Sequence, residues 1–159
     1  MGSTLEEAIS LMNGSSTSYD VVIVCTSDNF QADYWKRRLS LGLCSPKGPS
    51  NNSPFPMVLA VSEDWWAGGA GNGLGTLYAF QKASALAQSK YGVDLLVQLD
   101  EKAISAALYH TAGKGTRLAP LPASENNNKP AVRLPATIDV GGDKVPITVL
   151  GKFCSVPSR

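Results

Sequence analysis

The 159-residue sequence predicts an α/β domain with a mostly parallel sheet flanked by helices. Residues 21–26 and 57–61 are unbroken runs of apolar and β-branched side chains, which are typical of strands buried on both faces. A segment of helical periodicity follows each run, and residues 103–109 predict a third strand rich in small side chains. Strands that alternate with helices in this way favour parallel pairing.

The first 18 residues are predicted to lie outside this domain. Residues 4–12 predict a short helix that begins with the spacing of a capping box. Glycine, serine and threonine dominate residues 13–18, which indicates a linker. The predicted division is therefore a helix and linker at 1–18 and a single α/β domain at 19–159.

A helix is predicted after the first strand, with Ser27 or Asp28 as its cap and Gly42 at its end. Its apolar face is predicted from side chains at helical spacing, namely Phe30, Tyr34 or Trp35, and Leu39. Lys36, Arg37 and Arg38 form a basic cluster on the polar side. Phosphate binding is one interpretation of this cluster, but a solvated helix face is favoured.

A second helix is predicted at residues 76–90, after a glycine-rich loop at 63–75. Its inner face is predicted from apolar and small side chains, namely Leu77, Phe80, Ala83 or Ser84, and Leu86 or Ala87. Residues 94–101 are ambiguous between helix and strand.

The last third of the chain is predicted to hold a long basic loop at 111–135 and a hairpin at 137–149. Gly141 and Gly142 mark the turn of this hairpin. Its two aspartates, Asp139 and Asp143, are interpreted as turn residues.

Composition and charge limit the classes of function. The net charge of +1 gives little support to nucleic-acid binding, for which a strongly basic domain is usual. No apolar run approaches the roughly 18 residues of a membrane span, and the N-terminus lacks the basic start of a signal peptide. We therefore expect no nucleic-acid partner, no membrane partner and a cytoplasmic location. The oligomeric state does not follow from the sequence.

The three cysteines are odd in number and share no CxxC spacing, which argues against a disulfide framework or a zinc ribbon. They are expected to be reduced thiols, and a reducing compartment fits a cytoplasmic protein. His110 is the only histidine and follows the third predicted strand. A metal cluster around it is excluded for want of partners, so no metal ligand is predicted, although a catalytic triad stays open.

The first glycine-rich loop precedes the helix at 76–90 and places backbone N–H groups at a helix N-terminus, where anions bind. A dinucleotide fingerprint read from Gly71 and Gly73 fails because position 76 is threonine, and a P-loop read from Gly68 fails because position 74 is leucine. A flexible connection without a ligand is the alternative. Trp65 and Trp66 in this loop could stack on a base or a sugar, but packing is an equal alternative.

The second glycine-rich loop follows the third strand. Gly113 and Gly115 expose backbone amides, and Thr116 adds a hydroxyl. Arg117 offers a planar fork suited to phosphate oxygens, and Lys129 adds a point charge. This loop is therefore a candidate cradle for a triphosphate.

The segment from Ala112 to Leu118, followed by Pro120-Leu121 and Lys129-Pro130, resembles the signature of sugar nucleotidyltransferases. These enzymes, also called nucleoside-diphosphate-sugar pyrophosphorylases, carry A-G-x-G-T-R-[LM], then Pro-Leu, then a lysine. The layout of residues 19–112, with Gly71-Asn72-Gly73 and Thr76-Leu77, is loosely similar to the fucose-1-phosphate guanylyltransferase and fucokinase/GDP-fucose pyrophosphorylase group. The resemblance implies a Rossmann-like fold of the nucleotide-diphospho-sugar transferase type.

The resemblance also implies an activity and a site. A nucleoside monophosphate would pass from an NTP, with GTP or UTP slightly favoured, to a sugar-1-phosphate with release of pyrophosphate, usually with Mg²⁺. The catalytic residues would be Arg117, on the departing pyrophosphate, and Lys129, between the two phosphates. The nucleotide-binding residues would be Ala112, Gly113, Lys114, Gly115 and Thr116, with Gly71 and Gly73 as secondary contacts.

The sequence departs from the family after this loop. Only 42 residues follow Arg117, and the aspartate that holds Mg²⁺ in the family has no clear counterpart. The chain is therefore expected to be an N-terminal portion, with no magnesium ligand identified. A non-catalytic nucleotide-binding or interaction module is the first alternative, and a truncated, inactive fragment is the second.

Overall fold

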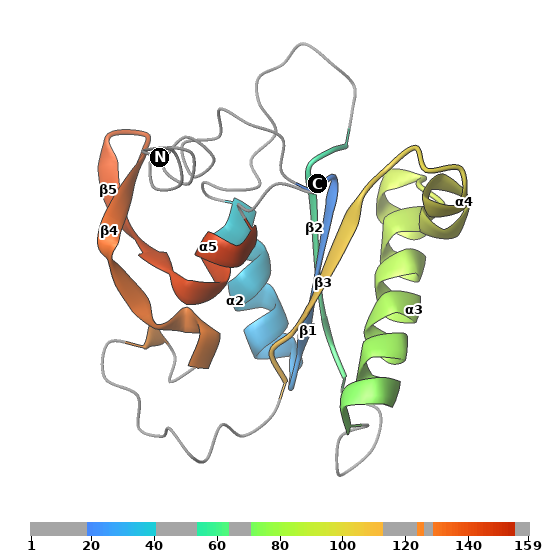
Figure 1. Cartoon of the computed structure of the whole chain (residues 1–159), viewed down its shortest axis with the longest axis horizontal. Helices are drawn as coiled ribbons and strands as arrows, with labels where there is room; N and C mark the ends of the chain where they lie inside the picture. The colour runs from blue at the N-terminus through green and yellow to red at the C-terminus, as the bar shows by residue number, and fades with distance from the viewer. Residues whose placement is uncertain (1–18, 41–53, 64–70, 113–123, 126–128, 155–159) are drawn as a thin grey trace, which may run out of the picture.

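The computed structural model describes residues 19–40, 54–63, 71–112, 124–125 and 129–154 (Figure 1). The predicted helix at 4–12 and linker at 13–18 lie outside these residues. In chain order the elements are β1 (Val21–Thr26), α2 (Asn29–Ser40), β2 (Met57–Ser62), α3 (Gly71–Tyr91), α4 (Leu95–Asp100), β3 (Ala106–His110), the 3-10 turn η2 (Lys129–Ala131), β4 (Arg133–Val140), β5 (Asp143–Thr148) and α5 (Val149–Cys154).

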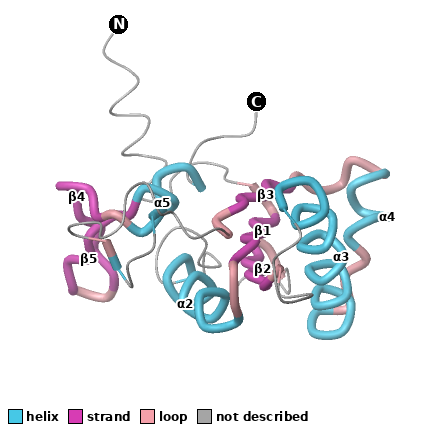
Figure 2. Tube along the Cα trace, turned by 90° about the horizontal axis from the view of Figure 1, so that it is seen from below, coloured by secondary structure: helices cyan, strands magenta, loops and turns pink. Residues whose placement is uncertain are grey.

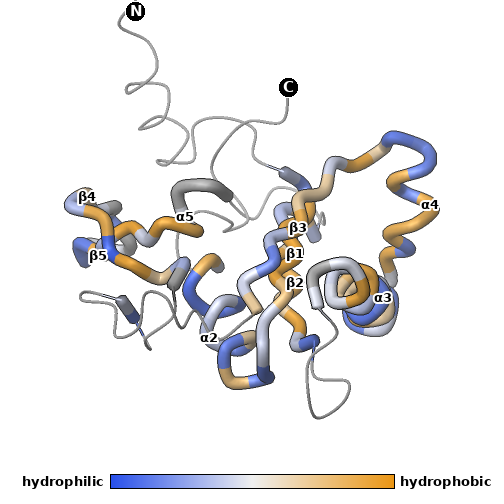
Figure 3. The backbone as a smooth tube through the Cα atoms, turned by 60° about the horizontal axis from the view of Figure 1, so that its bottom comes forward, coloured by the Kyte–Doolittle hydropathy of each residue, from blue (hydrophilic) through white to orange (hydrophobic). Residues whose placement is uncertain are grey.

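The central sheet has three parallel strands in the order β2-β1-β3. Val21 pairs with Met57 on one side and with Ala106 on the other. All six side chains of β1 are buried, as are all six of β2. Hydrophobic residues lie along both strands in Figure 3. The predicted α/β class with a parallel sheet is confirmed. The third strand starts later than predicted, at Ala106 instead of residue 103.

Helices cover both faces of the sheet, and Figure 2 shows α2 and α3 on opposite sides of it. Because side chains alternate along a strand, β1 contributes to two cores. The core on the α2 side contains Val22, Val24, Ala32, Trp35, Leu39, Val58, Ala60, Ala131 and Leu150. The core on the α3 side contains Val21, Ile23, Cys25, Met57, Leu59, Val61, Ala79, Ala83, Ala87 and Leu95.

Helix α2 begins at the second of its two predicted caps. The Asp28 carboxylate accepts a hydrogen bond from the Gln31 amide at 2.8 Å, which satisfies a free N–H of the first turn. Trp35, not Tyr34, is fully buried, and the prediction that Phe30 packs inward is wrong because its exposed fraction is 66%. The structure describes this helix as far as Ser40, and its predicted end at Gly42 lies outside the described residues.

Helix α3 begins at Gly71, five residues before the predicted start. Its buried residues are Gly75, Ala79, Ala83 and Ala87, and the three alanines have no exposed surface. The prediction that Leu77 lies on the inner face is wrong, since that side chain is 54% exposed. Small side chains at intervals of four let the helix axis approach the sheet closely, which a leucine would prevent.

The remaining elements decide the predictions made for residues 94–101 and for the last third of the chain. The segment that was ambiguous contains the helix α4 over Leu95–Asp100, and the Asp94 side chain caps it by accepting from the amides of Leu96 and Val97. The predicted hairpin is confirmed as β4 and β5, with positive φ at Gly141 and Gly142. Asp139, in β4, accepts from the Gly142 amide at 2.9 Å, so its side chain stabilises the turn as predicted, whereas Asp143 is the first residue of β5. Strand β4 begins at Arg133, inside the segment predicted as a loop.

Candidate functional site

The carboxyl ends of the three parallel strands meet at one edge of the sheet. β1 ends at Thr26, β2 at Ser62 and β3 at His110, and helix α3 begins at the same edge, at the lower end of the sheet in Figure 1. Ligands of open α/β sheets bind in the crevice outside this edge. We call the region formed by these three strand ends, the residues that directly follow them and the first turn of α3 the carboxyl edge.

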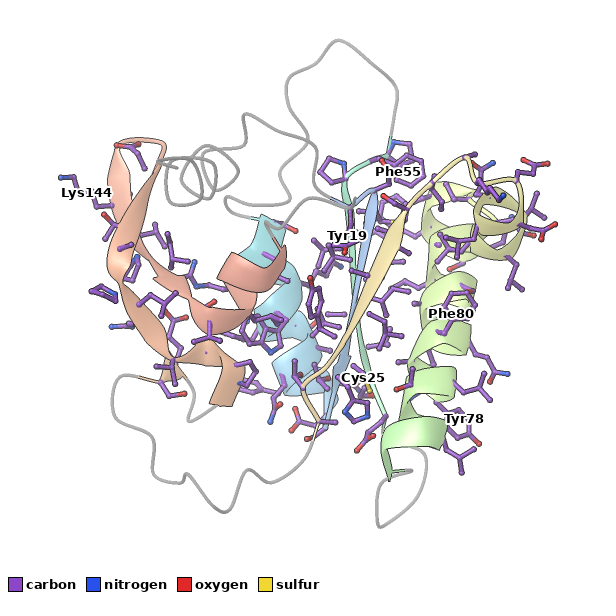
Figure 4. All side chains as sticks on the ribbon, in the orientation of Figure 1. Tyr19, Cys25, Phe55, Tyr78, Phe80 and Lys144 are labelled. Atoms are coloured by element: carbon purple, nitrogen blue, oxygen red, sulfur yellow. The ribbon has the colours of Figure 1, made fainter. Side chains whose placement is uncertain are left out.

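Three chemically reactive side chains converge at the carboxyl edge. They are Cys25 near the end of β1, Glu63 directly after β2 and His110 at the end of β3, and their ligand atoms all lie within 4.8 Å of one another. His110 Nε2 lies 3.3 Å from Glu63 Oε2. The prediction that His110 lacks partners is therefore wrong, because the fold unites residues that are far apart in the sequence. Figure 4 shows Cys25 between the sheet and the first turns of α3.

The contact between His110 and Glu63 is close but is not a hydrogen bond. Within the described part of the chain, both Nε2 and Oε2 are buried and neither has a hydrogen-bond partner. Both side chains are mostly buried, with 18% of His110 and 12% of Glu63 exposed. Two buried polar atoms therefore face each other without a hydrogen bond between them.

Cys25 is fully buried, and its thiol donates to the Gly75 carbonyl oxygen at 3.6 Å. Burial, together with the nearby Glu63 carboxylate, raises the pKa of Cys25 to about 11, and Lys82 opposes this shift. At neutral pH the thiol is thus protonated, whereas a nucleophilic cysteine needs a lowered pKa. This arrangement therefore gives Cys25 no support as a nucleophile, and the Ser-His-Asp triad left open around His110 stays untested.

Gly75 is the glycine that this cluster requires. A Cβ atom at position 75 would lie 2.8 Å from His110 Nε2 and even closer to Glu63 Oε2. Gly71 and Gly73 would meet nothing within 4 Å, and Gly71 has a φ of +70°. These two predicted nucleotide contacts therefore lie in the first turn of α3, not in a loop, and their surroundings are open. Sequence reasoning singled out Gly71 and Gly73 and missed the role of Gly75.

Hydrogen bonds hold the two residues before the second glycine-rich loop, Thr111 and Ala112, at the carboxyl edge. The Cys25 carbonyl oxygen accepts from the Thr111 amide, the Thr111 hydroxyl and the Ala112 amide at 2.8, 2.8 and 3.1 Å. The Ala112 amide, predicted to hold phosphate, is thus engaged with the protein. The other predicted residues of this loop lie outside the described residues, namely Gly113, Lys114, Gly115, Thr116 and Arg117.

Lys129 lies in η2, and its side chain is outside the described part of the structure. η2 belongs to the α2 side of the sheet, since Ala131 is buried in that core. The cysteine, glutamate and histidine lie on the α3 side. The two predicted catalytic residues, Arg117 and Lys129, therefore have no described side-chain geometry. Trp65 and Trp66 also fall outside the described residues.

A second polar cluster lies on the α2 side, around Glu125. Its carboxylate accepts from the Tyr34 hydroxyl and forms ion pairs with Arg38 and Arg133, each at 3.1 Å. Arg38 also donates to the carbonyl oxygen of Pro146. The favoured interpretation of the basic cluster of α2 as a solvated face is wrong for Arg38, whose side chain is only 12% exposed.

The same contacts shift two pKa values. Burial alone would raise the pKa of Glu125, but hydrogen bonds from Tyr34, Arg38 and Arg133 hold it below its ordinary value. Burial and the hydrogen bond to Glu125 raise the pKa of Tyr34. Glu125 is therefore an anion that anchors the chain shortly before Lys129, and sequence reasoning did not identify it.

A shallow hollow lies elsewhere, over α4, and is lined by Leu96, Val97, Leu99 and Asp100. It belongs to the end of α3 opposite the carboxyl edge, as Figure 1 shows. Its lining is mainly aliphatic with one carboxylate, so it offers little chemistry. The carboxyl edge is therefore the stronger candidate site.

Comparison with protein-family models, with curated proteins and with solved structures gave no match for this chain. Within the described residues, no helix is long and apolar enough to cross a membrane.

Proposed function

We propose that this chain is the nucleotide-binding part of a sugar-1-phosphate nucleotidyltransferase with a Rossmann-like domain at 19–159. One observation carries the proposal: the first turn of α3 and the start of the signature segment, at Thr111 and Ala112, lie at the same carboxyl edge. Both glycine-rich segments would then serve one nucleotide. A cytoplasmic location goes with this proposal.

The first turn of α3 supports the binding of a phosphate. A helix of 21 residues directs its free N–H groups and the positive end of its dipole toward the carboxyl edge. Gly71 and Gly73 are exposed and have open space around their Cα atoms. A triphosphate could therefore approach this backbone without displacing any side chain that the structure describes.

The signature segment would supply the remaining groups, in the roles that the resemblance implies. Gly113, Gly115 and Thr116 would hold the nucleotide phosphates, with Lys114 beside them. An oxygen of the sugar-1-phosphate would attack the α-phosphorus, and the bond to the β-phosphate would break. Arg117 would stabilise the charge on the departing pyrophosphate, and Lys129 would bridge the α-phosphate and the sugar phosphate.

The described residues do not fit the Mg²⁺ ion that the resemblance implies. The group at the carboxyl edge offers a thiol, an imidazole and one carboxylate. Magnesium requires near-octahedral oxygen ligands and is usually held by carboxylates and phosphates. We therefore assign no residue of this chain to Mg²⁺ and derive no step through it.

Calorimetric titration with GTP, UTP and ATP, each with Mg²⁺, tests the proposal. We expect saturable binding with a preference for one base. R117A should weaken this binding about 10- to 100-fold, as expected for a lost charge-assisted hydrogen bond. K144A removes the same charge from the exposed hairpin, where Lys144 lies far from the carboxyl edge in Figure 4, and should have little effect.

If R117A and K144A lower the nucleotide affinity equally, the binding is a general attraction between charges, and this result would contradict the proposal. A folded chain that binds none of the three nucleotides would contradict it as well. Pyrophosphate exchange then separates the enzyme from its first alternative. Binding without exchange would favour a non-catalytic nucleotide-binding module, and the absence of cooperative unfolding would favour a truncated fragment.

A further inference from the structure

We infer that Cys25, Glu63 and His110 form a binding site for one Zn²⁺ ion, with a fourth position left open to another ligand. This site lies at the carboxyl edge on the α3 side of the sheet. It does not depend on nucleotide binding, because all three ligands come from the described framework of the sheet.

The donor set is that of zinc. Zn²⁺ is bound in proteins by cysteine sulfur, histidine nitrogen and carboxylate oxygen, in tetrahedral geometry. Three protein ligands with an open fourth position are typical of zinc sites that bind a further molecule. The thiolate of Cys25 and the carboxylate of Glu63 together neutralise the charge of the ion, and the thiol proton passes to solvent on binding.

The separation of the His110 and Glu63 ligand atoms fits a shared ion. Two ligand atoms about 2.1 Å from a tetrahedral zinc ion lie about 3.4 Å apart. The distance between His110 Nε2 and Glu63 Oε2 is 3.3 Å, and these atoms form no hydrogen bond with each other. Glu63 is a buried residue, with 9% of its surface exposed. A cation between the two atoms would satisfy buried lone pairs that otherwise have no partner in the described structure.

The sheet register holds the three ligands on one side. Cys25 pairs directly with His110 across β1 and β3, and with Val61 across β1 and β2. Glu63 is two residues beyond Val61, so the alternation of side chains directs it to the same face. The Glu63 amide donates to the Thr26 carbonyl oxygen at 2.8 Å, which continues the β-type pairing past the end of β2.

Helix α3 leaves room for this cluster only because residue 75 is glycine. A Cβ atom there would collide with the ligand atoms of both Glu63 and His110. Lys82 from the same helix donates to the Ser62 carbonyl oxygen at 2.6 Å, so its ammonium group is directed to the backbone. The packing of α3 thus places its backbone against the ligand atoms of Glu63 and His110 and covers these atoms from solvent.

Metal binding by the full chain, without nucleotide, tests this inference. We expect one equivalent of zinc to remain after dialysis and to raise the unfolding temperature, because the ion binds the folded state. Co²⁺ in place of zinc should give the d–d bands of a tetrahedral site and a thiolate-to-cobalt charge-transfer band. C25S should abolish the charge-transfer band, whereas C44S should keep it.

A matched pair of glycine variants separates the site from general effects on folding. G75A should lower zinc affinity about 10- to 100-fold, which is the range for disturbed ligand orientation. G73A adds the same methyl group where nothing lies within 4 Å, and it should leave zinc affinity unchanged. Circular dichroism on both variants reports whether each is folded.

Three results would overturn the inference. They are a folded chain that retains no stoichiometric zinc, a charge-transfer band that persists in C25S, and equal zinc affinities of G75A and G73A. Since nucleotide titration is a separate experiment on the same chain, failure of one proposal leaves the other to be judged by its own data.

Discussion

At the scale of single residues, the Glu125 carboxylate contacts three polar side chains from two other parts of the fold. Its carboxylate accepts from Tyr34 in α2 and pairs with Arg38 and Arg133. These contacts connect α2, the segment at 124–125 and the start of β4. Hydrogen bonds to a charged group are about twice as strong as neutral ones, so this residue should hold the α2 side of the fold together.

E125Q should lower the free energy of unfolding by about 1–3 kcal/mol at pH 7, because the arginines lose a charged acceptor in a partly buried position. The folded-state pKa of Glu125 lies below its ordinary value of 4.5. Its stabilisation is therefore complete above that pH and is lost as the pH falls through the lower folded-state pKa. Urea unfolding at pH 7 and at pH 3 measures both effects.

The control for this change is E101Q. Glu101 is an exposed residue at the end of α4, so its substitution should change stability by less than about 0.5 kcal/mol. If E125Q is no more destabilising than E101Q at pH 7, or if its effect grows as the pH falls, the assigned role of Glu125 is wrong.

At the scale of elements, α3 is placed by its alanines. Ala79, Ala83 and Ala87 have no exposed surface and pack against β1 and β2. The close approach of this helix also brings Gly75 onto the cysteine, glutamate and histidine of the carboxyl edge. The position of the helix and the geometry of the candidate site therefore depend on the same small side chains.

A83L should destabilise the fold by about 1–3 kcal/mol, since three added carbon atoms have no space between α3 and the sheet. A85L places the same side chain on the exposed face of the helix and should have little effect. Thermal unfolding of both variants measures the difference. Equal unfolding temperatures would mean that α3 does not pack as closely as described.

At the scale of the whole molecule, the sequence predicts the framework better than the site. The runs at 21–26 and 57–61 predict the buried strands because a strand covered on both faces needs nothing but apolar side chains. The sequence does not predict the start of α3, because glycines in a helix are unfavourable by about 1 kcal/mol each relative to alanine and are typical of loops.

The candidate cluster could not be predicted from spacing. Cys25, Glu63 and His110 share no motif, and they meet only through the strand order β2-β1-β3. One general signal was available, because each of them lies near the carboxyl end of a predicted parallel strand. The family resemblance instead indicates a site in the segment after Ala112. The roles that it implies for Arg117 and its neighbours stay predictions.

Amide hydrogen exchange of the full chain, with and without the preferred nucleotide and Mg²⁺, tests most directly whether the carboxyl edge is the functional edge of this protein. Slower exchange in residues 71–77 and 106–112, with no change in residues 94–101 of the α4 region, is the result that we predict. Protection confined to residues 94–101, or no protection anywhere at saturating nucleotide, would contradict it.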